Sequence, residues 1–404
     1  MSDTAQTCIL AAETMPAPLA SRRGRRMAMG AEADTARHRF ARRLRGGLYT
    51  CIVALSAILT VDLAAKAQEN AVMQPGDAAV TAFSGARQIG EVPPGSSPAD
   101  VTFINTNGAS LQVFDLSAPG AAPDGQVFTA PVKYRVNAGE IGQVFAIALD
   151  RASGSEGDSP DIYAGQTSAF GLQLVLPDAD GDGRPERTKK GHPDAEWMAG
   201  QFGPEGGPGA IWKVDGETGA VSLFATVPNN SGPGLGDIVV DPATHQFFVS
   251  NLDDGLIYRL DRTGAVRDSF DHGQAGRTAA GLAPIADDGA KADIKSPAFD
   301  SEDPATWGFT QPERRVWGLG LRAGRLHYAV ADGPSIWSVS INLDGTFGED
   351  PRLEIEVSGT PANHPISDIA FDSADYMYIA QRGGIKGSYD YSVFADSKQS
   401  VLWR

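Results

Sequence analysis

A two-part pattern recurs along the chain and constrains its fold more than any other feature. Its second part is an alternating strand, a turn and a further strand. Each copy begins with an aliphatic residue followed by an aromatic one: Ile211-Trp212, Ile257-Tyr258, Ile336-Trp337 and Leu402-Trp403. The three complete copies then turn at Gly219, Gly264 and Gly345. Alternation of apolar and polar residues on both sides of a glycine turn predicts a β-hairpin.

The first part of the pattern precedes each hairpin as a strand, a polar turn and a second apolar strand. Clear copies are GDIVVDPATHQFFVSN from Gly236 and SDIAFDSADYMYIAQ from Ser367, and others start at Phe145 and Gly318. An aspartate ends the first strand in three copies: Asp150, Asp241 and Asp372. The two parts together give four strands in about 45 residues, the scale of one β-propeller blade.

We therefore predict an all-β fold, a β-propeller of four-stranded antiparallel blades. Six or seven blades are expected of a closed ring, whereas four units are clear and a fifth is possible. Residues 101–117 alternate around Asn107-Gly108 and are expected to supply outer strands of a further blade. Either amino-terminal strands complete the ring, or the chain is a piece of a longer polypeptide.

The amino-terminal 67 residues differ from the rest of the chain. Nine arginines between Arg22 and Arg45 precede an apolar run at 48–61, which ends before Ala65-Lys66-Ala67. A basic region, an apolar run and small residues at a cleavage site predict a signal peptide at 1–67 and a propeller at 68–404. The run of 14 residues is shorter than the roughly 20 that span a bilayer, so a retained anchor is the weaker alternative. We expect export to the periplasm, the medium or the outer surface of a Gram-negative bacterium.

The remaining chain is strongly acidic. The leader holds 10 of the 34 Lys and Arg residues and 5 of the 50 Asp and Glu residues, which leaves 24 basic and 45 acidic residues. This charge repels phosphate backbones and anionic lipids, so nucleic-acid binding is not expected and basic partners are favoured. Both cysteines, Cys8 and Cys51, lie in the leader, so the rest of the chain has no disulfide or thiolate chemistry.

The sharpest local motif is DADGDGRPER, within an insertion at about 176–208. Asp178, Asp180 and Asp182 occupy positions 1, 3 and 5 of an EF-hand-like loop; the Arg184 carbonyl would supply position 7 and Glu186 position 9. Position 12 is a lysine rather than the bidentate glutamate, so another carboxylate, Asp194 or Glu196, is expected to help. The motif predicts a Ca²⁺ site that stiffens the loop, and its alternative is a polar insertion without an ion.

A second insertion at 273–312 is rich in Ala, Gly, Asp and Pro and predicts a long surface loop. A third, at 384–399, lengthens the last unit. Trp197, Trp307 and Trp317 are candidates for a surface on which sugars stack, although blade packing explains a tryptophan equally well.

The repeat resembles NHL-type and gluconolactonase/regucalcin-like propellers over residues 140–404. The chain is also similar to the amino-terminal portion of large uncharacterised proteobacterial envelope proteins. The first resemblance implies an axial divalent ion held by Glu, Asn and Asp side chains. Asn251 and Asp332 end strands where such ligands would lie, but no matching glutamate is found near the amino terminus. Asp237 and Asp368 begin strands in two units and are further candidates for one face of the ring.

No pattern in the sequence identifies a catalytic centre: the histidines form no close pair and no nucleophile motif is present. We expect an exported binding or scaffold module, calcium-stabilised, that presents an acidic face to a protein or carbohydrate partner. The alternative is a gluconolactonase-like hydrolase with an axial divalent metal. Three or more carboxylate or amide side chains around one channel would favour the enzyme.

Overall fold

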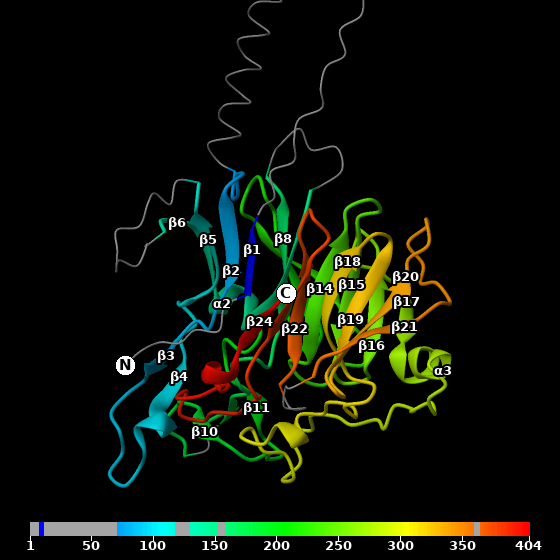
Figure 1. The fold of residues 1–404 in the computed structure, drawn as a ribbon. Helices are drawn as coiled ribbons and strands as arrows, with labels where there is room; N and C mark the ends of the chain where they lie inside the picture. Colours follow the sequence, from blue (N-terminus) through cyan, green and yellow to red (C-terminus); the bar gives the residue numbers. More distant parts are fainter. Residues whose placement is uncertain (1–7, 12–70, 118–129, 152–158, 179, 359–363) are drawn as a thin grey trace, which may run out of the picture.

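The computed structural model describes residues 8–11, 71–117, 130–151, 159–178, 180–358 and 364–404. These residues form five blade-like antiparallel sheets, four with four strands and one with three, in the arrangement of a β-propeller (Figure 1). The predicted fold class is confirmed, and the five sheets agree with the four or five units visible in the sequence. Among the described residues, no helix has the length and apolar character needed to cross a bilayer.

The first sheet has the strand order β1-β2-β5-β6. Its strands are β1 (Cys8–Ala11), β2 (Asp77–Thr81), β5 (Ala109–Asp115) and β6 (Val132–Asn137). Because β1 lies in the predicted leader, removal of the leader would leave β2 as an edge strand with unpaired backbone groups. The turn at 107–108 does not form a hairpin: β5 joins this sheet, whereas β4 (Thr102–Ile104) pairs with β3 (Ala86–Gln88).

The other four sheets follow the repeat in chain order. The second has an insertion between its strands β8 and β12. The second sheet contains β7 (Val144–Asp150), β8 (Asp161–Gln166), β12 (Ala210–Val214) and β13 (Val221–Thr226). The third contains β14 (Leu235–Asp241), β15 (Gln246–Asn251), β16 (Leu256–Leu260) and β17 (Val266–Asp271). The fourth contains β18 (Val316–Arg322), β19 (Arg325–Val330), β20 (Ser335–Ser340) and β21 (Arg352–Glu356). The fifth contains β22 (Ile366–Phe371), β23 (Met377–Gln381) and β24 (Val401–Trp403).

In the second, third and fourth sheets, the aliphatic-aromatic pair packs the sheet between two neighbours. Successive side chains of a strand point to opposite faces. Trp212 therefore packs toward the first sheet and Ile211 toward the third. Tyr258 packs toward the second sheet, and Ile257 toward the fourth, in a core that also holds Trp337. The repeated pair is thus the residue pattern that lets sheets pack face to face, and the first strands β7, β14, β18 and β22 lie side by side in that order.

Four segments between the strands pack together at one end of the ring, the lower end in Figure 1, and are called the platform. They are residues 83–108, 172–202, 282–312 and 383–399. The platform contains a small sheet of order β10-β9-β11, made of β9 (Leu174–Leu176), β10 (Glu186–Thr188) and β11 (Glu196–Trp197). Its helical turns are η1 (Pro98–Val101), η3 (Pro304–Thr306) and η4 (Ser397–Gln399). Outside it lie α2 (Ala138–Ile141), the π-helical turn η2 (His272–Gly276) and α3 (Arg277–Ala279).

The segment at 282–312 is packed against the rest of the platform over part of its length. Gly191 donates its amide to Phe299 O at 3.0 Å, and Ser301 donates to Lys189 O at 2.8 Å. Trp307 is 1% exposed and shares a core with Leu172 and Leu174. This segment therefore covers β9 rather than extending freely into solvent.

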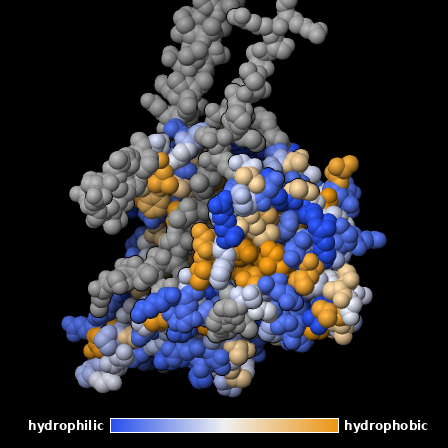
Figure 2. All heavy atoms as spheres, in the orientation of Figure 1, coloured by the Kyte–Doolittle hydropathy of each residue, from blue (hydrophilic) through white to orange (hydrophobic). Residues whose placement is uncertain are grey.

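The fifth sheet presents apolar side chains on the face shown in Figure 2, where they gather over β22 and β24. Its last strand is exposed throughout, and Leu402 is 70% exposed. The other large exposed apolar residues of this strand are Val401 and Trp403. In the described residues this sheet has three strands where its neighbours have four.

Candidate functional site

The predicted calcium loop connects β9 to β10, which pair as a hairpin. The chain turns sharply here: φ is 44° at Asp178, 82° at Gly181 and 83° at Gly183. Glycine adopts these left-handed conformations without steric cost, because it has no Cβ. The two glycines thus let a short loop fold back on itself and direct its carboxylates inward.

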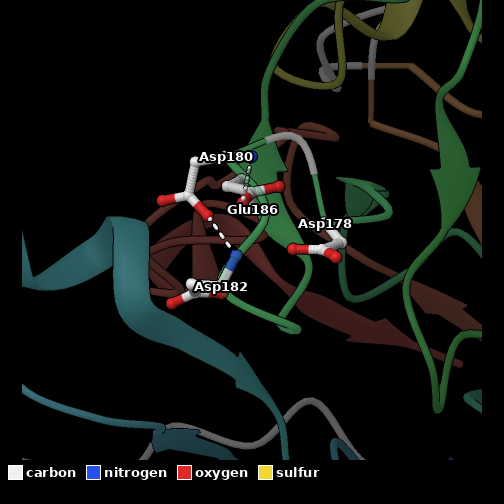
Figure 3. A group of neighbouring side chains, drawn as sticks. All are labelled: Asp178, Asp180, Asp182 and Glu186. Atoms are coloured by element: carbon white, nitrogen blue, oxygen red, sulfur yellow. Dashed lines mark hydrogen bonds between the residues drawn. The ribbon is translucent and has the colours of Figure 1, made fainter.

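Four side chains converge in this loop (Figure 3). One carboxylate oxygen each from Asp178, Asp180, Asp182 and Glu186 lies within 4.8 Å of the others. The loop also folds around its own carboxylates: Gly183 donates its amide to Asp178 at 2.7 Å, and Asp182 donates to Asp180 at 3.0 Å. Three of the carboxylates are exposed and Glu186 is half-buried, so an ion could enter from solvent.

This donor set suits a hard divalent cation, since Ca²⁺ takes six to eight oxygen ligands in a flexible geometry. Asp194 and Glu196 are not part of the group, and Asp194 lies beside His192 instead. Lys189, at position 12, pairs with Glu302 at 3.0 Å and is directed into the platform. The sequence therefore identified the four carboxylates that converge, whereas its suggestion for a fifth is not supported by this geometry.

The loop is attached to the platform through Arg187, the residue after Glu186. Its guanidinium donates to Ala99 O at 2.6 Å and to Gln173, and it lies over the rings of Tyr389 and Tyr391 at 3.9 and 4.9 Å. These contacts come from three separate segments of the chain. The conformation of the carboxylate loop is thus coupled to the packing of the platform.

Asp237 on β14 and Asp368 on β22 lie close enough for the charge of Asp368 to act on Asp237. Asp237 is 5% exposed and accepts from the amides of Ile238 and Leu319, both at 2.8 Å. Burial raises the pKa of Asp237 well above its usual value, and the charge of Asp368 raises it further. The first strands carry a bulge at this position, which turns the Asp237 side chain toward β18. Its carboxyl group therefore ties the third sheet to the fourth.

Asn251 is fully buried and its side chain is occupied by the protein. It donates to Pro228 O and Asn229 O, both at 3.2 Å, and accepts from Asn230 at 2.7 Å. An amide that makes these bonds holds the loop before β14 and has little capacity left for a metal. Asp332 is exposed and lies in the turn after β19.

A cavity of about 350 Å³ opens at the end of the ring beside Asp332. This volume is within the range of small-ligand sites. Its charged residues are Glu313, Arg315 and Asp332, and its remaining lining residues are Pro312, Trp317, Ala331, Pro365 and Ile385. Arg315 is anchored by donating to Thr310 O, and burial lowers the pKa of its guanidinium to about 10.

None of the three tryptophans that the sequence suggested for sugar stacking is exposed. Trp317 is 4% exposed and Trp307 is 1% exposed, and Trp197 packs edge-on against Phe202 and Phe299. The three residues do not form one exposed sugar-stacking surface, because Trp197 and Trp307 are used in packing, whereas Trp317 contributes to the wall of the cavity.

Asp253 was missed by the sequence reasoning. It is 3% exposed, and Ser231 donates to its Oδ2 from both amide and hydroxyl, at 2.7 and 2.6 Å. Its Oδ1 is buried without a hydrogen-bond partner among the described residues. Burial raises the pKa of Asp253 to about 7, although the Ser231 bonds act in the opposite direction. The Asp253-Asp254 pair directly after a predicted strand was the available signal.

Comparisons with known proteins bear on the fold. No family model matches the sequence, and no curated protein matches it. Similar solved structures include a glucose dehydrogenase (10% identity, 81% of this chain, 77% of that chain, TM-score 0.36). A calcium-binding regucalcin from Agrobacterium tumefaciens has 12% identity over 61% of this chain and 70% of its own, with a TM-score of 0.31.

A third similar structure is a Bacteroides thetaiotaomicron protein of unknown function (9% identity, 81% of this chain, TM-score 0.37). The present chain spans 56% of that protein's length. The glucose dehydrogenase and the regucalcin are β-propellers. Because these three TM-scores are below 0.5, the fold assignment for this chain rests on its own sheets and their order.

Proposed function

We propose that this chain is an exported β-propeller that acts as a binding module at the envelope or surface of a Gram-negative bacterium. The proposal rests on the hydrogen bonds made by polar residues that were candidates for axial metal ligands. Asp237 and Asn251 are bonded to neighbouring backbone, so they hold blades and loops in place. In the described part of the chain, three or more His, Cys, Asp or Glu side chains converge as potential metal ligands only in the loop at 178–186.

The cavity at the ring end is the proposed binding site. It combines an apolar wall with two carboxylates, Glu313 and Asp332, and one guanidinium, Arg315. The surplus of acidic residues over basic ones favours a cationic protein segment as its partner, and a carbohydrate is the other class expected. Export is supported by the leader pattern at 1–67.

The loop at 178–186 is proposed to bind Ca²⁺ as a structural ion. Asp178, Asp180, Asp182 and Glu186 would supply carboxylate oxygens, and the ion would offset their mutual repulsion. A fixed loop would stabilise β10, and through Arg187 the platform that borders the cavity. The residues thus fit the ion, and its role in this proposal is stability rather than chemistry.

Calcium titration with calorimetry and thermal melting tests this part. At a 100-fold excess over the dissociation constant, a ligand that binds only the folded state stabilises it by about 2.7 kcal/mol. We expect Asp180→Asn to lose this stabilisation. Asp194→Asn removes a nearby carboxylate outside the group and is the matched control. Equal calcium responses in the two variants, or no response in the wild type, would contradict the proposal.

A metal-dependent lactonase remains the alternative, and the observation in its favour is that the half-buried Asp368 lies near the buried Asp237. Lactone hydrolysis that requires a divalent metal and disappears in Asp368→Asn would establish the enzyme. Binding of a basic peptide or a polysaccharide that is weakened by Asp332→Asn, without hydrolysis, would establish the module. Absence of both activities would exclude the cavity and the axis as functional sites.

A further inference from the structure

Arg382 is a buried arginine at the ring end. It follows β23 in the fifth sheet and is 5% exposed. Its side chain extends toward the second sheet, where Nη2 donates to Ala169 O at 3.3 Å. The guanidinium carbon lies 5.9 Å from the ring centre of Phe145 on β7. The charge thus lies between two sheets that are not neighbours in the ring.

The guanidinium of Arg382 has few hydrogen-bond partners. Arginine carries five N–H donors, and that one long bond to Ala169 is the only side-chain hydrogen bond Arg382 makes within the described residues. Its Nε is buried without a partner. Burial alone lowers the pKa of Arg382 to about 10, and no acidic side chain acts in the opposite direction.

Two other buried arginines provide the comparison. Arg314 is 2% exposed and donates to Asp254 O, to Ile285 O and to the carboxylate of Asp271. Arg187 is 8% exposed, donates to two oxygens and lies against two tyrosine rings. The Nε of Arg187 also lacks a partner, but its other donors bond two oxygens and its charge lies against two aromatic rings, whereas Arg382 makes one long hydrogen bond. Arg382 is thus the least satisfied of these three buried arginines.

A buried charge without a counterion costs several kcal/mol, and arginine does not escape this cost by losing its proton. We infer that Arg382 binds a carboxylate that is not part of the described residues. A carboxylate matches the guanidinium fork in shape and accepts two parallel hydrogen bonds. A single positive charge also balances a single negative charge, whereas a phosphate dianion would need further donors.

The backbone of Arg382 lies next to the proposed binding cavity, while its side chain extends toward the second sheet. Its amide donates to Pro365 O at 3.1 Å, and Pro365 lines the cavity. The carboxylate belongs either to a small organic acid or to a polypeptide, and the experiment separates the two. The inference does not depend on calcium in the loop at 178–186.

The test measures binding of defined carboxylates to the purified protein. Sodium acetate and sodium phosphate are compared with sodium chloride at equal ionic strength by thermal melting and calorimetry. N-acetyl-Ala-Ala and its carboxyl-terminal amide form the polypeptide arm. We expect acetate or the free-acid peptide to raise the melting temperature by about 2 °C or more at saturation, with smaller effects of phosphate and of the amide.

The variant Arg382→Met should lose at least about tenfold in carboxylate affinity, since charge-assisted hydrogen bonds are removed. Arg352→Met, which removes an exposed arginine paired with Glu354, should bind as the wild type does. A wild type that responds to neither carboxylate, or equal responses in wild type and Arg382→Met, would overturn the inference. If Arg382→Met does not fold, Arg382→Lys takes its place, and the wild-type titration alone still decides whether a carboxylate binds.

Discussion

Asp253 offers the most direct test of the reasoning about buried charge. Its carboxyl group is 3% exposed, and burial raises its pKa from 3.8 to about 7. Each tenfold change in acidity corresponds to about 1.4 kcal/mol. At pH 8, ionised Asp253 therefore destabilises the fold by roughly 4 kcal/mol, compared with an aspartate whose pKa is the same in the folded and the unfolded chain.

The sign follows from which state binds the proton. Well below pH 3.8 the carboxyl group is protonated in the folded and the unfolded chain, so it adds no pH dependence. Between pH 4 and 7 the unfolded chain has released the proton and the folded chain retains it, so stability falls as pH rises. Above pH 7 both states are ionised, and the loss is complete.

Asp253→Asn removes the ionisation and should flatten this part of the pH profile. Urea unfolding at pH 4, 6 and 8 measures the effect, with the exposed Glu349→Gln as the control. We expect the variant to gain stability over the wild type as pH rises, up to roughly 4 kcal/mol at pH 8. A variant whose stability relative to wild type is the same at pH 4 and pH 8 would refute the account.

Two further predictions concern contacts between segments. Asp237→Ala should destabilise the fold by about 2–3 kcal/mol in urea unfolding, because the buried amide of Leu319 loses its acceptor, whereas Asp237→Asn should cost less. Comparable losses in the two variants would contradict this role. Arg187→Met should loosen the platform, so that limited proteolysis cuts residues 383–399 faster than in the wild type while Lys398→Met leaves cutting unchanged. Unaltered cutting in Arg187→Met would show that the contacts of Arg187 are not needed to hold the platform together.

The hairpins of the propeller follow from short stretches of sequence. The turns at Gly219, Gly264 and Gly345 have φ between 71° and 83°, which glycine permits, and the flanking residues alternate between two faces. Asp241 and Asp372 bond to amides two residues later, so their repeated position marks a local turn. The carboxylates of the 178–186 loop converge for the same reason, because nearby residues determine the path of the chain.

The platform and the ring end were not predictable in this way. Arg382 reaches Ala169 across 213 residues of sequence, and Tyr389 reaches Asp100 across 289. No periodicity or spacing records such pairs, because the residues that meet are far apart along the chain.

The sequence alone determined the alternating strands, their hairpin partners, the order of the blades and the acidic loop, since each depends on contacts between residues close along the chain. Only the tertiary structure decided which polar groups are buried, and hence that Asp237 holds two blades together, that Asn251 holds a loop and that Arg382 has no counterion among the described residues. Burial depends on how distant segments pack, and the acidity and binding capacity of a side chain depend on its burial.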